Sequence, residues 1–422
     1  MRRALAVLAL AATCVLWVRP LLWTFHRGQP DARDFAPVIA GAHCLFSPCN
    51  PYDSKVVEQF FHQLTGRGVF IAPEVPVYPP ATFLTLSPLL LLKWPAMHLT
   101  WTLVSAGSLL AIYFFWILKF ELYSSLIAYL PIVFVLQSGI MFPALWVGQP
   151  AVLAVSSGAA GMILIVSGTT PVLAALMLAL SLALKPQLVL APALYLLCRR
   201  STRKQTGAAF ALAIFAFLLG TALLYSHLHS LSFFARESAN MKLSLEPGHL
   251  SDPSPANPDS FDFLNLQVPL DRLLPNAAVA NAISDAVTIA LFLALAYLTL
   301  GKAAFDERPY TIIAILVLLS LLPAYHRVFD KLLLLLLIPA LWELRRCRSL
   351  YWGMTALAFL WIFDHRLATD ISPRAGLFPY TAFVEILMCI ALLASFRICH
   401  PGRRASPFVK RLSPDPRERS SG

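Results

Sequence analysis

The chain has 422 residues, of which 58% are hydrophobic and 13% are charged, and its formal net charge is +11. Soluble domains contain about 25% charged residues, so this composition excludes an ordinary soluble protein and indicates an integral membrane protein. The basic residues lie in short loops between apolar runs, which argues against nucleic acid as a partner.

Long apolar runs recur along the chain, and several reach the ~20 residues that a helix needs to cross hydrocarbon. Continuous runs of this kind are typical of membrane helices rather than of barrel strands. We therefore expect an all-α polytopic bundle. The runs lie at about residues 4–24, 81–95, 97–118, 122–141, 149–167, 171–198, 207–226, 277–300, 310–324, 328–342, 350–363 and 376–396.

The first run follows Arg2 and Arg3 and has features of a signal peptide. Its sequence AATC at residues 11–14 resembles a lipoprotein cleavage box, but Thr13 stands where a small Gly, Ala or Ser is expected. We therefore interpret the run as an uncleaved first helix.

Lysine and arginine in short loops set the expected orientation, because cytoplasmic loops carry an excess of them. The basic segments are the N-terminus, residues 198–204, 301–308 and 343–348, and the tail from residue 397. Both termini are therefore expected in the cytoplasm of a multi-pass plasma (inner) membrane protein, and about 12 crossings satisfy this parity. The long loops 25–80 and 227–276 lean acidic and are expected outside, with short interfacial helices.

The parity leaves two alternatives open. Two helices in residues 81–118 and one in residues 171–198, the choice that length favours, put Lys185 deep in the membrane and Gln149 inside. The converse choice puts both residues on the external face.

The expected domain organisation is one transmembrane domain over residues 1–398. Residues 399–422 are rich in Pro, Ser and Arg, which predicts a disordered cytoplasmic tail. The positive charge of this tail suits the anionic lipids of the cytoplasmic leaflet.

Polar residues gather at the expected external helix ends instead of following a pore. The groups are Asp31 and Asp34 with NPYD at 50–53 and YPP at 78–80, then DFLNLQ at 262–267, then residues 324–340 with His326, Arg327, Asp330 and Lys331. Ionisable groups at membrane depth are functional candidates.

The third group has helical spacing. If a helix starts near Tyr325, His326 pairs with Asp330, and Arg327 lines up with Lys331. Two cations on one stripe favour an anion site, since Arg binds phosphate with a planar fork and Lys as a point charge. A juxtamembrane turn neutralised by Asp330 accounts for the same residues.

Cys44 and Cys49 share the first long loop and can form a disulfide on an oxidising face. The sequence has no CxxC pair, no ligand spacing of a structural zinc site, no P-loop and no GxGxxG motif. A soluble nucleotide site is therefore not expected.

The motifs together resemble glycosyltransferase family 87, membrane enzymes of the GT-C class. The resemblance covers about residues 30–345 and depends on the order of individually weak motifs. They are Asp34, NPYD at 50–53, YPP at 78–80, Gly148 with Gln149, Lys185 with Pro186, Asn265, and residues 325–331. The chain departs from the family pattern in the insert HCLFSPC before NPYD and in the form of the last motif.

The resemblance implies a GT-C-type bundle that transfers a sugar, mannose in known members, from a polyprenyl-phosphate donor on the outer face. The leaving group is already a phosphate, so one carboxylate suffices to deprotonate the acceptor hydroxyl, while cations stabilise the phosphate. We expect Asp34 to be this catalytic base, with Asp31 as its rival. The acceptor is a glycolipid, a glycan or a protein.

The expected substrate-binding residues are His326, Arg327, Lys331, Lys185, Asn265, Tyr78, Asp53 and Gln149. Local roles compete at three positions: Asp34 can cap the helix that follows it, Asp53 suits a turn, and Gln149 can cap a helix. No cofactor is expected, and a divalent metal is not favoured. A transporter or flippase of a lipid-linked sugar is the alternative function, and a non-catalytic assembly subunit is the third.

Overall fold

The computed structural model describes residue 32 and residues 34–66, 77–119, 141–257, 260, 263–274, 276–300, 304–323, 326–345, 347–358 and 381–398. In these residues the regular structure is helical, apart from an isolated bridge between Phe263 and Arg327. The all-α prediction is confirmed for this part of the chain. The expected helix at 4–24, most of the run 122–141, Asp31 and the tail 399–422 lie outside it.

The helices, in chain order, are α2 (Phe35–Cys44), α3 (Ser54–Thr65), α4 (Pro80–Leu86), η1 (Ser87–Leu91), α5 (Ala96–Lys119), α7 (Met141–Trp146), α8 (Ala151–Ser167), α9 (Pro171–Leu184), η3 (Pro186–Leu188), α10 (Leu190–Cys198), α11 (Arg203–Leu228), α12 (Ser232–Ser244), α13 (Gln267–Leu273), α14 (Ala277–Thr299), α15 (Ala304–Glu307), α16 (Pro309–Leu321), η5 (Val328–Leu336), α17 (Leu337–Leu344) and α19 (Thr381–Ile398).

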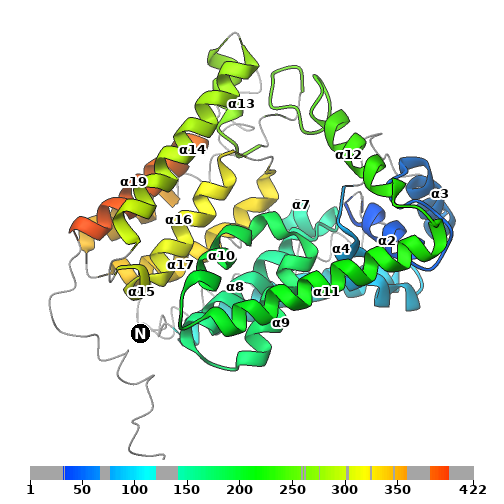
Figure 1. Cartoon of the computed structure of the whole chain (residues 1–422), viewed down its shortest axis with the longest axis horizontal. Helices are drawn as coiled ribbons and strands as arrows, with labels where there is room; N and C mark the ends of the chain where they lie inside the picture. The colour runs from blue at the N-terminus through cyan, green and yellow to red at the C-terminus, as the bar shows by residue number, and fades with distance from the viewer. Residues whose placement is uncertain are drawn as a thin grey trace, which may run out of the picture.

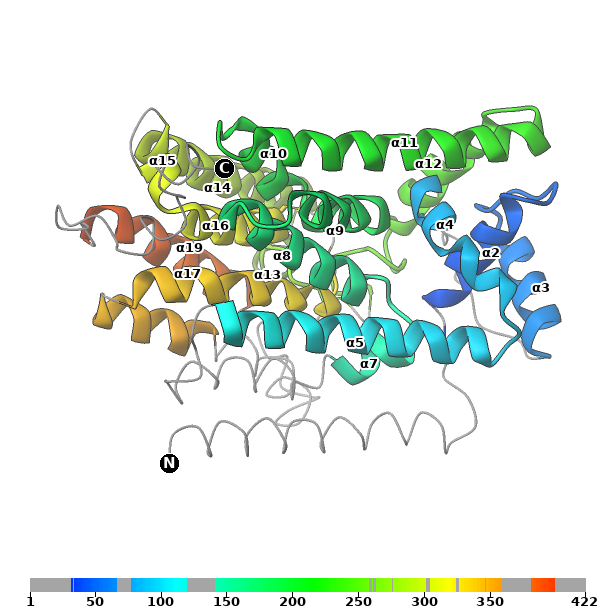
Figure 2. The same ribbon diagram turned by 90° about the horizontal axis from the view of Figure 1, so that it is seen from below.

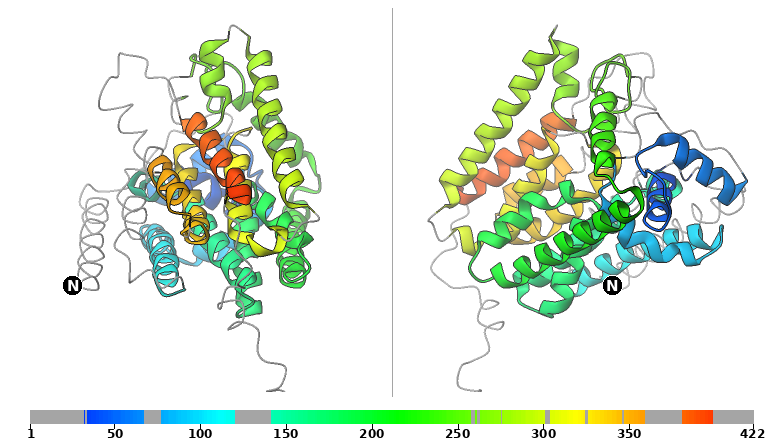
Figure 3. Two further views of the ribbon diagram at one scale, coloured as in Figure 1. Left: turned by 90° about the vertical axis from the view of Figure 1, so that its left-hand side faces the viewer. Right: turned by 45° about the vertical axis from the view of Figure 1, so that its right-hand side comes forward.

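The helices pack in two groups that meet near the middle of the molecule. One group holds α2, α4, α5, α8, α9 and α11, and the other holds α14, α16, α17 and α19 (Figure 1). Helices α5 and α11 run along the length of the first group (Figure 2), and α14 lies beside α19 in both views of Figure 3. The groups join where α8 contacts η5 and α10 contacts α16.

Small residues allow α8 and α9 to approach closely. At Gly161 an added Cβ would lie 2.6 Å from the backbone nitrogen of Leu178, a separation that real side chains do not reach. Helix pairs within membranes use small residues for this purpose, because packing replaces the hydrophobic effect as the driving force. This contact fixes the helix that leads to Lys185.

Two helices of the described part, α11 and α14, are long and apolar enough to cross a membrane. Each is only 17% buried over its most apolar window, and large apolar side chains cover their free faces. Examples are Phe215 and Leu218 on α11, and Phe292 and Leu293 on α14. Exposed apolar surface of this extent is typical of contact with lipid.

The run 171–198 is not one continuous helix, whereas the alternative favoured by length expects one; the run 81–118 divides into α4 with η1 and then α5, as that alternative expects. Helix α9 ends at Leu184, and α10 begins at Leu190. Lys185 between them has φ −155° and ψ 76°, because the residue before a proline is driven out of the helical region. The chain therefore turns at Lys185–Pro186, and the lysine side chain leaves the helix at this corner.

Candidate functional site

Asp34 precedes α2 and is fixed by the turn between α7 and α8. Its backbone N–H donates to the carbonyl of Val147 at 3.0 Å, and the N–H of Phe35 donates to the same oxygen at 3.1 Å. Asp34 occupies the N-cap position of α2, but its side chain makes no capping hydrogen bond. The carboxylate is therefore directed to another partner.

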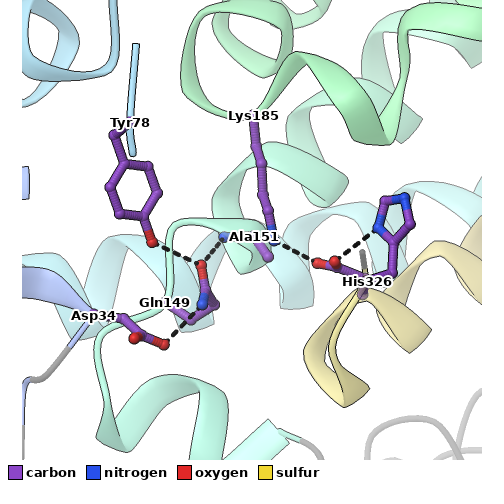
Figure 4. A network of polar contacts seen from close by, with 7 residues as sticks. Asp34, Tyr78, Gln149, Ala151, Lys185 and His326 are labelled. Atoms are coloured by element: carbon purple, nitrogen blue, oxygen red, sulfur yellow. Dashed lines mark hydrogen bonds and ion pairs between the residues drawn. The ribbon is translucent and has the colours of Figure 1, made fainter. Parts of the chain in front are cut away.

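That partner is Gln149, which is buried. Its Nε2 donates to Asp34 Oδ2 at 2.8 Å, while its Oε1 accepts longer bonds of 3.4 Å from Tyr78 Oη and from the N–H of Ala151 (Figure 4). The bond from Ala151 comes from the first residue of α8, whose N-cap position is held by Pro150, and the bond to Asp34 is an additional role of Gln149. Gln149 thus connects three segments that are distant in the sequence.

Gly148 makes this turn possible. Its φ is +71°, a conformation that side-chain-bearing residues rarely adopt, and an added Cβ would lie 2.6 Å from Cβ of Phe35. The carbonyl of Gly148 accepts a 2.9 Å bond from Nε1 of Trp101, whose ring stacks on Phe35. The turn that carries Gln149 is therefore held against the start of α2.

A second polar group is centred on Asp330, which is 2% exposed. Lys185 Nζ donates to Asp330 Oδ1 at 2.7 Å, and His326 Nδ1 lies 2.9 Å from Asp330 Oδ2. Figure 4 shows that Lys185 and His326 come from two different elements. The predicted pair of His326 with Asp330 is confirmed. Lys185 is an unforeseen third member, and its charge is partly neutralised.

The two groups belong to one region of the molecule. Helix α8, which Gln149 precedes, packs against η5, which contains Asp330. Thr82 Oγ1 donates 3.0 Å bonds to the carbonyls of Ala183 and Leu184, directly before Lys185. Gln149 and Lys185 therefore lie in the same region of the molecule as Asp34 (Figure 4).

Asn265 lies beside His326. The N–H of Leu264 donates to the carbonyl of His326 at 3.0 Å, which aligns the two segments. Asn265 Oδ1 and His326 Nε2 are both buried without a hydrogen-bond partner among the described residues. Buried polar atoms are almost always paired, so two such atoms in adjacent segments indicate a place for a polar ligand or water.

Arg327 and Lys331 do not form the stripe expected on an α-helix. The structure has a 3₁₀ helix over Val328–Leu336, and Arg327 lies just before this helix. Arg327 donates to the carbonyl of Leu250 at 3.2 Å and lies 5.9 Å from the ring centre of Phe263. Lys331 is buried within the 3₁₀ helix.

Of the remaining predicted binding residues, Asp53 caps a helix, whereas Tyr78 contacts Gln149 of the candidate site. Asp53 is the N-cap of α3 and accepts a 3.0 Å bond from the N–H of Lys55, so its local role is the one observed. Tyr78 reaches Gln149, as described above.

Cys44 and Cys49 form the expected disulfide. Among the described residues, no group of three or more His, Cys, Asp or Glu side chains could hold a metal ion.

Comparison with known families gives one match. The model of glycosyltransferase family 87 matches residues 77–255, a stretch that contains Tyr78, Gln149 and Lys185. No curated protein and no solved structure matches the chain.

Proposed function

Residues 77–255 match the model of glycosyltransferase family 87, and from this premise we propose that the chain is a member of that family and transfers a hexose from a polyprenyl-phosphate-linked donor to a lipid or glycan acceptor. Members of this family are membrane glycosyltransferases, which agrees with the two long apolar helices. Mannose as the sugar, the external face as the site of transfer and the inner membrane as the location are parts of the proposal.

The observation that carries the proposal is the pairing of Asp34 with Gln149 close to the Lys185–Asp330–His326 group. The first group offers a carboxylate, which can accept a proton. The second offers a lysine and a histidine around one aspartate, which can balance negative charge. Inverting sugar transfer from a phosphate needs these two functions and no strong general acid.

In the proposed step, the acceptor hydroxyl oxygen attacks the anomeric carbon of the donor sugar. The bond from that carbon to the phosphate oxygen breaks, and the phosphate leaves with the bonding electron pair. Asp34 takes the proton of the hydroxyl. The hydrogen bond from Gln149 Nε2 orients the carboxylate for this task.

The leaving phosphate gains one negative charge during this step. His326 Nδ1 contacts Asp330, which fixes the ring so that its buried Nε2 can donate to a phosphate oxygen when the imidazole is protonated. A preorganised donor in a site shielded from water stabilises developing charge more strongly than water does. Arg327 and Lys331 are proposed to bind the phosphate from the same segment.

Transfer of radiolabelled mannose from polyprenyl-phosphate-mannose into membrane lipids and glycans tests the proposal. We expect incorporation by the wild type and loss of at least ~100-fold in Asp34→Asn, because the amide cannot accept the proton. Asp53→Asn is the matched control and should retain activity, since Asp53 caps α3 and an asparagine caps equally well.

Full activity of Asp34→Asn would remove Asp34 from the mechanism. Movement of the lipid-linked sugar without any labelled product would instead favour the transporter. Activity that EDTA abolishes and magnesium or manganese restores would contradict the proposal that no divalent metal is needed.

A further inference from the structure

Tyr52 is completely buried and connects the second long loop to the YPP segment. Its Oη donates a 2.9 Å hydrogen bond to the backbone carbonyl of Tyr78. Its own carbonyl accepts a 2.9 Å bond from Nδ2 of Asn240 on α12, and its ring stacks on Phe233 of the same helix. Tyr52 is therefore held by α12 on one side and holds Tyr78 on the other.

The contacts continue from Tyr78 to the proposed base. Tyr78 Oη reaches Gln149 Oε1 at 3.4 Å, and Gln149 Nε2 donates to Asp34 at 2.8 Å. The bond between Tyr78 and Gln149 is long, so the position of the Tyr78 backbone decides whether it forms at all. Tyr52 fixes that backbone, and an error of about 1 Å in a catalytic constellation can cost ~100-fold in rate.

We infer that Tyr52 is a positioning residue for Asp34, acting through Tyr78 and Gln149. The role in catalysis rests on the proposed transfer reaction. The hydrogen bond from Tyr52 to Tyr78 does not depend on that reaction, and its effect on the structure can be tested without a transfer assay.

The first test is Tyr52→Phe, which keeps the stacked ring and removes the hydroxyl. With radiolabelled polyprenyl-phosphate-mannose as donor, we expect kcat to fall about 10- to 100-fold with little change in donor KM, because the base is misplaced while donor binding is kept. Tyr225→Phe is the control, since Tyr225 lies exposed on α11. A wild-type kcat in Tyr52→Phe would overturn the inference.

Hydrogen–deuterium exchange separates the inference from the proposed function. In Tyr52→Phe the amide hydrogens of residues 77–86 should exchange faster than in the wild type, while those of α14 should be unchanged. Unchanged exchange in residues 77–86 would overturn the inference whatever the transfer assay shows. Faster exchange together with no transfer by the wild type would support the connection and reject the polyprenyl-phosphate-mannose reaction.

Discussion

Gln149 donates a hydrogen bond to the carboxylate of Asp34 across 115 positions of sequence. The same amide accepts from Tyr78 and from the N–H of Ala151, so one buried side chain uses both of its ends. This arrangement orients the carboxylate, and it explains why Asp34 does not cap α2.

Replacing Gln149 with leucine should therefore damage catalysis more than folding. Gln149→Leu keeps the approximate volume but removes the donor to Asp34 and the acceptor for Tyr78, and we expect kcat to fall about 100-fold. Gln59→Leu on the exposed face of α3 is the control. Initial-rate transfer kinetics and the thermal unfolding midpoint are the measurements. A loss of stability as large as the loss of rate would show that Gln149 is mainly structural.

Gly148 is the position where a single methyl group should disrupt the site. In Gly148→Ala the new Cβ meets Phe35, and φ of +71° is strained for alanine, so we expect a destabilisation of roughly 1–3 kcal/mol and loss of transfer. Gly107→Ala in α5 meets no atom within 4 Å and should be neutral or stabilising, because alanine favours helix over glycine.

Gly66→Ala distinguishes backbone strain from the contact with Phe35 as the cause of the destabilisation expected at Gly148. Gly66 has φ +70° with no atom within 4 Å of an added Cβ, so only backbone strain applies there. Thermal unfolding in detergent measures all three variants. Equal losses at Gly66 and Gly148 would show that the contact with Phe35 is unimportant.

The sequence predicted the helical class and the contacts between residues close in the chain, but not the contacts between distant segments. The pair His326–Asp330 follows from spacing along one segment, and so does the disulfide between Cys44 and Cys49, because both partners are close in the chain. The bond from Lys185 to Asp330 spans 145 positions, and no local pattern indicates it.

The break at Lys185–Pro186 shows why the length of an apolar run is a weak guide to the number of helices. Residues 171–198 are almost uniformly apolar, so composition alone cannot divide them. Pro186 is the residue that indicates the break, because a proline restricts the backbone of the residue before it and ends the helix there. No local pattern indicates the role of Tyr52, because that role depends on α12, which lies in another loop.

The disulfide between Cys44 and Cys49 should contribute modestly to stability. It closes a loop with a sequence separation of 5, for which the chain-entropy estimate is roughly 2 kcal/mol. The double variant Cys44→Ala/Cys49→Ala should lower the unfolding midpoint and leave transfer largely intact, because Cys44 is the last residue of α2 whereas Asp34 precedes the first. Cys198→Ala is the control for cysteine removal, since Cys198 is free and exposed. Complete loss of transfer in the double variant would place the loop in the site.

Single and double variants of the ion pair between Lys185 and Asp330 distinguish an effect on stability from an effect on catalysis. Either Lys185→Met or Asp330→Leu leaves a buried charge without its main partner, and each should destabilise the protein by about 3–5 kcal/mol. The double variant removes both charges and should recover much of that stability. Transfer should remain lost in all three variants, because the group around His326 no longer balances the negative charge of the leaving phosphate.

The pair Arg199–Asp306 is the matched control for this cycle. Its distance is 3.1 Å, but the Asp306 side chain is 67% exposed, so Asp306→Asn should cost under ~1 kcal/mol. Thermal unfolding and transfer rates are compared for all variants. If the Lys185→Met/Asp330→Leu protein is both stable and active, the pair is only a structural contact, and stabilisation of the leaving phosphate must come from Arg327 and Lys331 instead. If it is stable and inactive, the charges themselves are required for transfer.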